Sequence, residues 1–416
     1  MRSRSSQWAW VMYDFGNSAY ALIVMTLFYP LFFARHVAPG PRATALWGIT
    51  AALSVLLVGV IGPALGAYAD QRTNRKGFFI VFSSAAIFGT ALLPITGYVP
   101  WALGALLFVF TNFCFGVALY LYDSFLVVVA DVRQPSTSLS GKGWAAGYIG
   151  GIVCLGLVYL IAGRRLPASQ QDYTLVFVVT SIFYLAVAIW PFKALPGDTM
   201  TGRAPVDAGV WHALKSAWAT LRNWRSAKRI FVFLLAMYFV MDGMTTIVYF
   251  VSLYAKDALG FTVTQTVLLL TVTQLVAVPF TWGVAAVAAR AGEVVVLIAC
   301  SLLWCFIVLA MYAYSDMRDY WWIAGLTGVV VGSTPAVARG YLAKIIPPAR
   351  RAEMFGFNST ASRIAALFGP VLFGVLSTSV GMKTALLLAV LPFFAVGVVL
   401  LLVVQAKAHA WKAADA

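Results

Sequence analysis

The chain has 416 residues, of which 62% are hydrophobic and only 10% are charged, so it has more apolar surface than a soluble domain of this size can bury. The formal net charge of +15 is spread over short segments between apolar runs, which is typical of membrane-topology signals and argues against a nucleic-acid partner. The four cysteines lie in apolar runs without a Cys-x-x-Cys spacing, so we expect neither a disulfide framework nor a metal site.

Apolar runs of about 20 residues, the length needed to cross hydrocarbon, recur along the whole chain. In lipid every backbone polar group must be satisfied within the segment, so each run is predicted to be a helix. The predicted fold is therefore an all-α membrane protein with twelve transmembrane helices. The runs are 8–34, 44–68, 78–98, 101–129, 143–162, 173–192, 229–254, 264–288, 294–314, 320–342, 355–378 and 382–404.

Lys and Arg residues are distributed unevenly between the two sets of loops. With the N-terminus inside, the inside segments hold 20 of them and the outside loops hold 7, while Arg339 and Arg363 fall within runs. Loops rich in Lys and Arg stay on the cytoplasmic side of a membrane, so the segments with the larger count are predicted to be cytoplasmic. Both termini belong to these segments and are therefore predicted to be cytoplasmic. We expect a monomeric, multi-pass protein in the lipid bilayer of a bacterial inner (plasma) membrane.

The longest polar segment, 193–228, separates six runs from six. It begins rich in Pro and Gly, and Trp and Leu then recur at helical spacing among basic residues, which predicts an amphipathic helix on the inner leaflet. A regulatory or partner-binding helix is the alternative. Asp14 in the first run has a counterpart in Asp242 of the seventh, so the sequence predicts two pseudo-symmetric six-helix bundles, 1–192 and 229–416.

The loop after the second run contains Gly66 and Asp70, followed by Arg72, Arg75 and Lys76. It resembles the G-x-x-x-D and R-[KR] loop of the major facilitator superfamily. The glycine allows two helices to approach, and the aspartate can accept hydrogen bonds from a helix N-terminus and pair with a basic residue. These five residues are predicted to form a gate on the inner side, with an ordinary topology-signal loop as the alternative.

Polar residues within the runs are the candidates for a binding site. A charge at the bilayer centre costs roughly 2.5–3.5 kcal/mol, and such residues usually face a cavity or a partner. Asp242 and Arg363 lie deepest, so we expect them either to meet the ammonium and the carboxylate of a solute or to form an ion pair in the binding site. Purely structural roles for these residues are the alternative. The predicted substrate-binding residues are Asp14, Asn17, Asn112, Asp123, Asp242, Thr246, Tyr249 and Arg363.

Small residues repeat along the fifth run as Gly143-x-x-x-Gly147-x-x-x-Gly151. Such a stripe lets two membrane helices approach closely. We expect it to be a packing surface, along which helices can also slide during transport.

Four further motifs carry a narrower resemblance. They are YDFGNSAY in the first run, Tyr122-Asp123-Ser124 followed by GWAAGYIGG, Asp242-Gly243 in the seventh run, and IIPPARRAEMFGF after the tenth. In order and topology they resemble the "unknown major facilitator" family, which includes the autophagy-related vacuolar amino-acid effluxer of fungi. The resemblance implies a secondary transporter. The family has Asn where this chain has Asp123, which leaves the substrate open.

The sequence has no pattern for covalent chemistry, ATP binding or a cofactor. We therefore expect a secondary active transporter, not an enzyme, for a small polar or zwitterionic solute that is amino-acid-like and exported. Asp242 or Asp14 could carry a coupling proton, and uniport is the alternative. An exporter of lipophilic or drug-like compounds is a further alternative, and a membrane-embedded enzyme is a more distant one.

Overall fold

The computed structural model describes residues 4–71, 74–129, 136–162, 169–197, 228–345 and 368–407, and within these ranges all regular elements are helices. Eleven helical segments of the described residues are long and apolar enough to cross a membrane. The predicted run 355–378 is represented by a shorter apolar helix, Phe368–Val380, and its earlier part lies outside the described residues. The predicted all-α membrane fold is confirmed.

The first six predicted runs correspond to consecutive helical segments. The first contains two π-helical stretches, which close i→i+5 turns, and the third ends in a short 3₁₀-helix. The elements are α1 (Arg4–Ala19), η1 (Tyr20–Phe28), α2 (Tyr29–Phe32), η2 (Phe33–Val37), α3 (Ala43–Gln71), α4 (Arg75–Leu92), η3 (Leu93–Tyr98), α5 (Trp101–Val129), α6 (Ser136–Ile161) and α7 (Gln170–Ala194).

The second half contains the remaining runs, and the predicted amphipathic helix of 193–228 lies almost wholly outside the described residues. Thr262 and Gln265 form a capping box that starts α10, and Gly292, with φ +97°, joins it to α11. The elements are α9 (Lys228–Asp257), α10 (Val263–Ala291), α11 (Glu293–Ala313), α12 (Met317–Val331), α13 (Ser333–Ile345), α15 (Phe368–Val380), α16 (Met382–Ala385), η6 (Leu386–Val390) and α17 (Leu391–Ala406).

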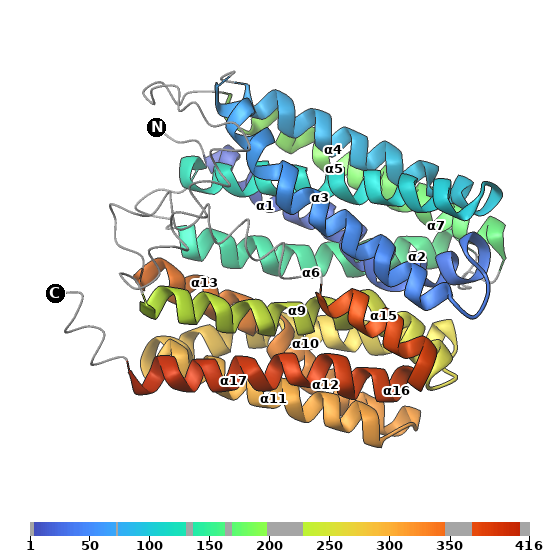
Figure 1. Cartoon of the computed structure of the whole chain (residues 1–416). Helices are drawn as coiled ribbons and strands as arrows, with labels where there is room; N and C mark the ends of the chain where they lie inside the picture. The colour runs from blue at the N-terminus through green and yellow to red at the C-terminus, as the bar shows by residue number, and fades with distance from the viewer. Residues whose placement is uncertain are drawn as a thin grey trace.

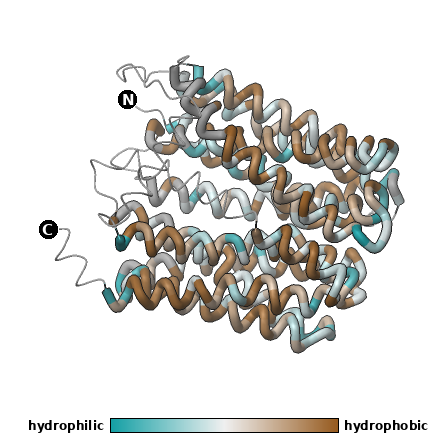
Figure 2. Tube along the Cα trace, in the orientation of Figure 1, coloured by the Kyte–Doolittle hydropathy of each residue, from teal (hydrophilic) through white to brown (hydrophobic). Residues whose placement is uncertain are grey.

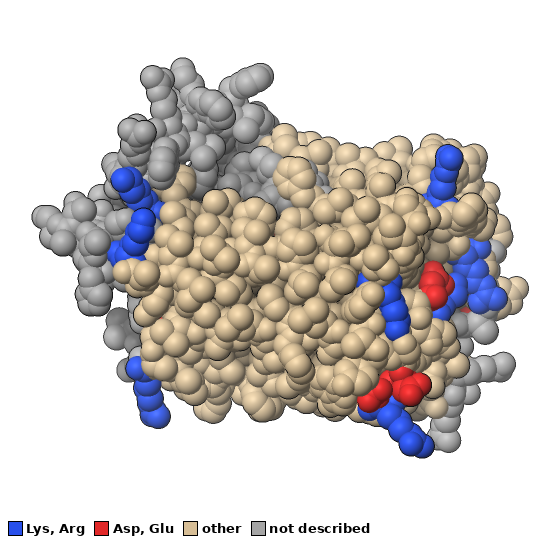
Figure 3. All heavy atoms as spheres, turned by 60° about the horizontal axis from the view of Figure 1, so that its bottom comes forward, with Lys and Arg blue, Asp and Glu red and all other residues tan. Residues whose placement is uncertain are grey.

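The helices form two bundles that lie side by side, α1 to α7 in one and α9 to α17 in the other (Figure 1). The start of α1 and the end of α17 lie at the same end of the molecule, here called the terminal end. The opposite end, which holds the loop 38–42, is called the far end. Hydrophobic residues dominate the middle of the helices (Figure 2), and the charged side chains visible in Figure 3 gather at the two ends, with an uncharged belt between them. This distribution fits a protein that spans a bilayer.

The predicted glycine stripe on α6 packs against α1. A Cβ atom on Gly147 would meet the hydroxyl of Ser18, and one on Gly151 would lie 3.0 Å from Leu22. Gly150, between them, leaves so little room that its Cβ would overlap the carbonyl oxygen of Phe15. The expectation of a packing surface is confirmed.

The two bundles touch closely at the far end. A Cβ atom on Gly48 of α3 would lie 2.5 Å from the carbonyl oxygen of Pro370, and one on Gly374 of α15 would lie 3.1 Å from that of Thr44. The indole N–H of Trp47 donates to the carbonyl oxygen of Tyr249 at 2.8 Å. Backbone-to-backbone approach at glycine and a hydrogen bond thus join α3 to both α15 and α9.

Candidate functional site

A cluster of four buried polar side chains joins the two bundles in the interior. The amide nitrogen of Asn112 on α5 donates to the hydroxyl of Ser54 on α3 at 2.7 Å and to that of Tyr249 on α9 at 3.4 Å. The hydroxyl of Tyr20 in η1 donates to the amide oxygen of Asn112 at 3.4 Å. All four residues are at most 4% exposed. We call Tyr20, Ser54, Asn112 and Tyr249 the interbundle cluster.

The hydrogen bonds of the interbundle cluster differ in length. The 2.7 Å bond between Asn112 and Ser54 is within one bundle, whereas the 3.4 Å bond to Tyr249 crosses between bundles. Bonds beyond about 3.2 Å are weak. The bond across the bundles and the equally long bond from Tyr20 are therefore the two that a solute group can replace at low cost.

Tyr20 reaches the interbundle cluster from a π-helical segment. η1 spans Tyr20–Phe28 and runs into Pro30, which has no N–H to donate to an earlier carbonyl. The wider i→i+5 turns change which residues share a face, and π-helical turns often occur at functional sites. Thr26 donates its hydroxyl to the carbonyl of Ala21, five residues earlier, at 2.9 Å, which satisfies one backbone oxygen of this segment.

Asp242 lies near the middle of α9 and is 3% exposed. Its Oδ2 accepts the backbone N–H of Gly369 on α15 at 2.9 Å. Its Oδ1 is buried and has no hydrogen-bond partner among the described residues. A buried carboxylate oxygen without a donor is costly, so this atom favours a proton or a cationic group of a ligand. Thr246, one turn further on, donates its hydroxyl to the carbonyl of Asp242 at 2.8 Å.

Asp14 occupies the corresponding place in the first bundle. Its Oδ1 accepts from the amide of Asn17 at 3.3 Å, so these two residues lie on one face of α1. A Cβ atom on Gly143 of α6 would meet Oδ2 of Asp14, just as one on Gly369 would lie 2.9 Å from Oδ1 of Asp242. In each bundle an aspartate of the first helix thus faces a glycine of the fifth. This supports the predicted repeat.

The remaining predicted residues do not all come together. Asp123 has an exposed side chain and lies three helical turns from Asn112 along α5, so it does not belong to the interbundle cluster. Arg363 lies outside the described residues, and its predicted role stays a prediction.

The structure describes only part of the predicted gate. The Nζ atom of Lys76 donates to the carbonyls of Lys193 and Leu195, at 3.1 and 2.8 Å, and so satisfies the end of α7. Arg75 begins α4, and Arg72 lies outside the described residues. Gly66 and Asp70 belong to α3, without a described side-chain environment. The gate therefore stays a prediction.

Sequence reasoning missed Tyr20, Ser54 and Gly369. Trp47, Thr50 and Ser54 have the spacing i, i+3, i+7 of one helical face, so a polar stripe on α3 was visible in the sequence. Tyr20 is the last residue of the YDFGNSAY motif, but a π-helical turn has no clear sequence signal. Gly369 contributes only its backbone, which no pattern of side chains reveals.

The fold resembles that of solved transporters. The nucleoside transporter NupG has a TM-score of 0.71 at 14% identity, over 96% of this chain and 99% of its own. The D-xylose-proton symporter has a TM-score of 0.71 at 15% identity, over 97% of each chain. The chain therefore has the fold of these transporters, that of a multi-pass helical membrane protein, with a polar cluster between its two bundles.

The sequence comparisons identify the family. The chain belongs to the family described as "Vacuole effluxer Atg22 like", whose model matches residues 42–414. The MFS-type transporter YxiO of Bacillus subtilis is 29% identical over 405 residues, covering 94% of this chain and 93% of its own. Autophagy-related protein 22-1 of Penicillium rubens is 22% identical over 418 residues, covering 80% and 70%. The resemblance inferred from the four motifs is confirmed, and the protein is a transporter of the major facilitator type, not an enzyme.

Proposed function

We propose that this protein is a secondary active transporter that exports a small polar or zwitterionic, amino-acid-like solute by alternating access. The observation that carries the proposal is the buried Oδ1 of Asp242, which has no described partner, two turns along α9 from the interbundle cluster. An ammonium group suits this oxygen, and a hydroxyl, amide or carboxylate suits the cluster. The family description as an effluxer supports export.

Alternating access needs contacts between the bundles that can break and re-form. The cluster bond from Asn112 to Tyr249 and the Trp47 bond to the Tyr249 carbonyl both cross between bundles and both end on the same residue of α9. A solute that displaces the weaker bond, that from Asn112 to the Tyr249 hydroxyl, shifts the equilibrium between conformations in which the bundles touch and conformations in which they are apart. This couples occupancy of the site to the contact at the far end.

The coupling ion in this proposal is the proton, carried by Asp242. When no ammonium occupies the site, a proton can satisfy the buried Oδ1. Asp14, the second candidate, accepts from Asn17 and is half-buried, so it has less need of a proton. We further propose a bacterial inner membrane with both termini in the cytoplasm, which follows from the loop charges, and a monomer as the transporting unit.

Transport by reconstituted protein tests this proposal. A thermal-shift screen of amino acids, sugars, nucleosides and peptides first finds a solute that stabilises the folded protein. Exchange and proton-driven flux of that solute are then measured in proteoliposomes. Asp242→Asn is expected to abolish proton-driven flux, while Asp257→Asn on the same helix, whose exposed carboxylate pairs with Lys256 at 3.7 Å, is expected to behave like the wild type.

The outcomes separate the parts of the proposal. If Asp242→Asn retains full proton-driven flux, the carboxylate does not carry the proton. If Asp242→Asn and Arg363→Gln both retain the wild-type affinity for the solute, the proposed recognition of a zwitterion is wrong. If only lipophilic compounds stabilise the protein and are transported, the alternative of a drug-like substrate replaces it.

A further inference from the structure

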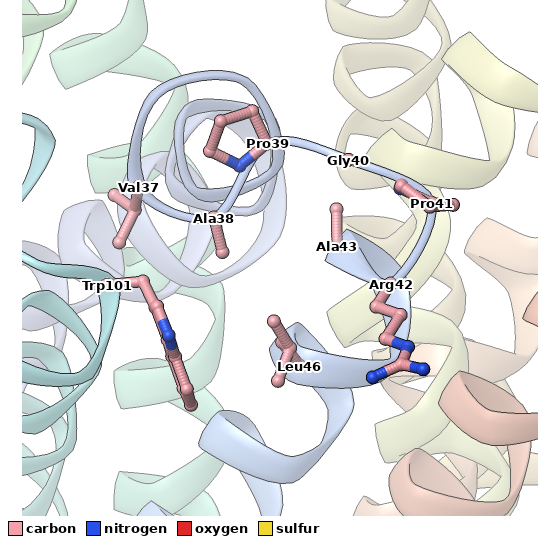
Figure 4. Close-up of a pocket in the computed structure, with 9 residues that line it drawn as sticks. All are labelled: Val37, Ala38, Pro39, Gly40, Pro41, Arg42, Ala43, Leu46 and Trp101. Atoms are coloured by element: carbon pink, nitrogen blue, oxygen red, sulfur yellow. The ribbon is translucent and has the colours of Figure 1, made fainter.

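A pocket of about 340 Å³ opens at the far end, between the loop that joins η2 to α3 and the start of α5 (Figure 4). Trp101 of α5 forms one wall, and Arg42, directly before α3, and Leu46, in the first turns of α3, form the other. Pro39, Gly40 and Pro41 cover it at the loop. None of the residues assigned above to solute binding or gating lines this pocket.

Arg42 is the only charged residue among those that line the pocket. Its side chain is exposed, and its guanidinium has no hydrogen bond or ion pair with any residue that the structure describes. The lining contains no Asp or Glu. The pocket therefore presents an unneutralised guanidinium, which binds phosphate and carboxylate groups through paired N–H donors.

An apolar stripe continues from the pocket toward the middle of the membrane. Leu46, Ile49 and Leu53 lie on one face of α3. Arg42, just before the helix, continues this face at the spacing i, i+4, because its carbonyl accepts the backbone N–H of Leu46 at 3.0 Å. Ile49 is 48% and Leu53 is 43% exposed, so this face is turned away from the helix bundle. Trp101 is 48% exposed beside the pocket, where a tryptophan at the end of a membrane helix sits at the level of the lipid headgroups.

We propose that this pocket binds a phospholipid with an anionic headgroup. The headgroup phosphate lies on the guanidinium of Arg42, an acyl chain follows Leu46, Ile49 and Leu53 along α3, and the indole of Trp101 packs beside the glycerol region. A phospholipid has both a phosphate for the guanidinium and an apolar chain for the exposed stripe, so it matches both parts of the surface. The site is separate from the proposed solute site, and its occupancy does not depend on the transported solute.

The position of the site connects the lipid with the contact between the bundles. The opposite face of the same two turns of α3 carries Thr44 and Gly48, which pack against α15. A lipid seated on Arg42 and Leu46 orders the start of α3 from the outside. It is therefore expected to stabilise the folded protein, since a ligand that binds only the folded state raises the melting temperature.

Binding of phosphatidylglycerol to the purified full-length protein tests the proposal. Retention of phosphatidylglycerol and phosphatidylcholine is measured by native mass spectrometry, and the melting temperature is measured with each lipid and with inorganic phosphate. The wild type is expected to retain phosphatidylglycerol preferentially. Arg42→Gln is expected to reduce that retention about tenfold, the effect of losing one charge-assisted contact. Arg318→Gln removes another exposed arginine at the far end and is the matched control.

Each outcome is decisive. Loss of phosphatidylglycerol retention and of its thermal stabilisation in Arg42→Gln, with neither lost in Arg318→Gln, supports the site. Equal retention by the wild type and Arg42→Gln overturns it, as does an equal loss in both variants, which indicates a general surface effect. Stabilisation by inorganic phosphate as large as that by phosphatidylglycerol also overturns it, because the ligand is then a free anion. A second variant, Trp101→Leu, keeps the apolar wall and is expected to retain the headgroup preference.

Discussion

Replacing Gly48 by alanine is expected to weaken the contact between α3 and α15 at the far end. The added Cβ would lie 2.5 Å from the carbonyl oxygen of Pro370, about 0.9 Å closer than the 3.4 Å at which ordinary contact begins. The Cζ atom of Phe250 would lie 3.1 Å from the same Cβ and the Cα of Gly374 3.3 Å from it. Because the nearest atom belongs to the backbone of α15, the two helices themselves have to separate. Overpacking of this kind costs about 1–2 kcal/mol.

That cost acts on the conformation in which the bundles touch at the far end. A change of about 1–2 kcal/mol alters the ratio of two conformations roughly 5- to 30-fold. The ratio is measured by the rate at which a membrane-impermeant maleimide labels a cysteine placed at Thr50, a buried position of α3. The four native cysteines are replaced by alanine beforehand. Gly48→Ala is expected to raise the labelling rate by about that factor.

Gly156→Ala is the matched control, because a Cβ on Gly156 of α6 meets no atom within 4 Å. It is expected to leave the labelling rate unchanged. If Gly48→Ala also leaves the rate unchanged while the protein stays folded, the close approach of α3 and α15 does not limit opening of the far end, and the reasoning is refuted.

Three other substitutions test separate parts of the structure. Tyr249→Phe removes the hydroxyl that Asn112 reaches at 3.4 Å. Because this bond is long, we expect the free energy of unfolding to fall by less than about 1 kcal/mol. If the hydroxyl contacts the solute, we expect solute affinity in a binding assay to fall about tenfold. Lys76→Met removes the donor to two carbonyls at the end of α7. It is expected to lower the melting temperature because these carbonyls lose their partner, while the protein still inserts into the membrane as the wild type does. Gly150→Val places a branched side chain against the Phe15 carbonyl, so yield of folded protein by size-exclusion chromatography is expected to fall sharply.

Each of these has a result that contradicts it. Solute affinity that is unchanged in Tyr249→Phe removes this hydroxyl from the site. A melting temperature for Lys76→Met equal to that of Lys256→Met, an exposed lysine on α9, shows that the α7 cap adds nothing. Wild-type yield of Gly150→Val shows that α1 and α6 can separate freely.

The sequence by itself determined the helices and the class of protein. Apolar runs of membrane length admit only helices in lipid, so eleven long spans and the α15 segment fall where hydropathy placed them. The four motifs that carry the family resemblance, taken together in their order and topology, were sufficient for the family. Helical periodicity also predicted the glycine stripe of α6, because it fixes which residues lie together on one face of a helix.

The tertiary structure decided which helices meet and through which atoms. Asn112 and Tyr249 were candidates on separate helices, and only packing showed that they share a hydrogen bond with Tyr20 and Ser54 nearby. The partner of Asp242 is a backbone N–H, which every residue but proline possesses, so no sequence pattern singles out Gly369. A pattern of charges does not show which groups a lysine contacts, and only the packed structure showed that the ammonium of Lys76 reaches two carbonyls at the end of α7. Helical periodicity shows which residues share one face of a helix. Which faces touch each other, and through which atoms, depends on how the helices of both bundles pack.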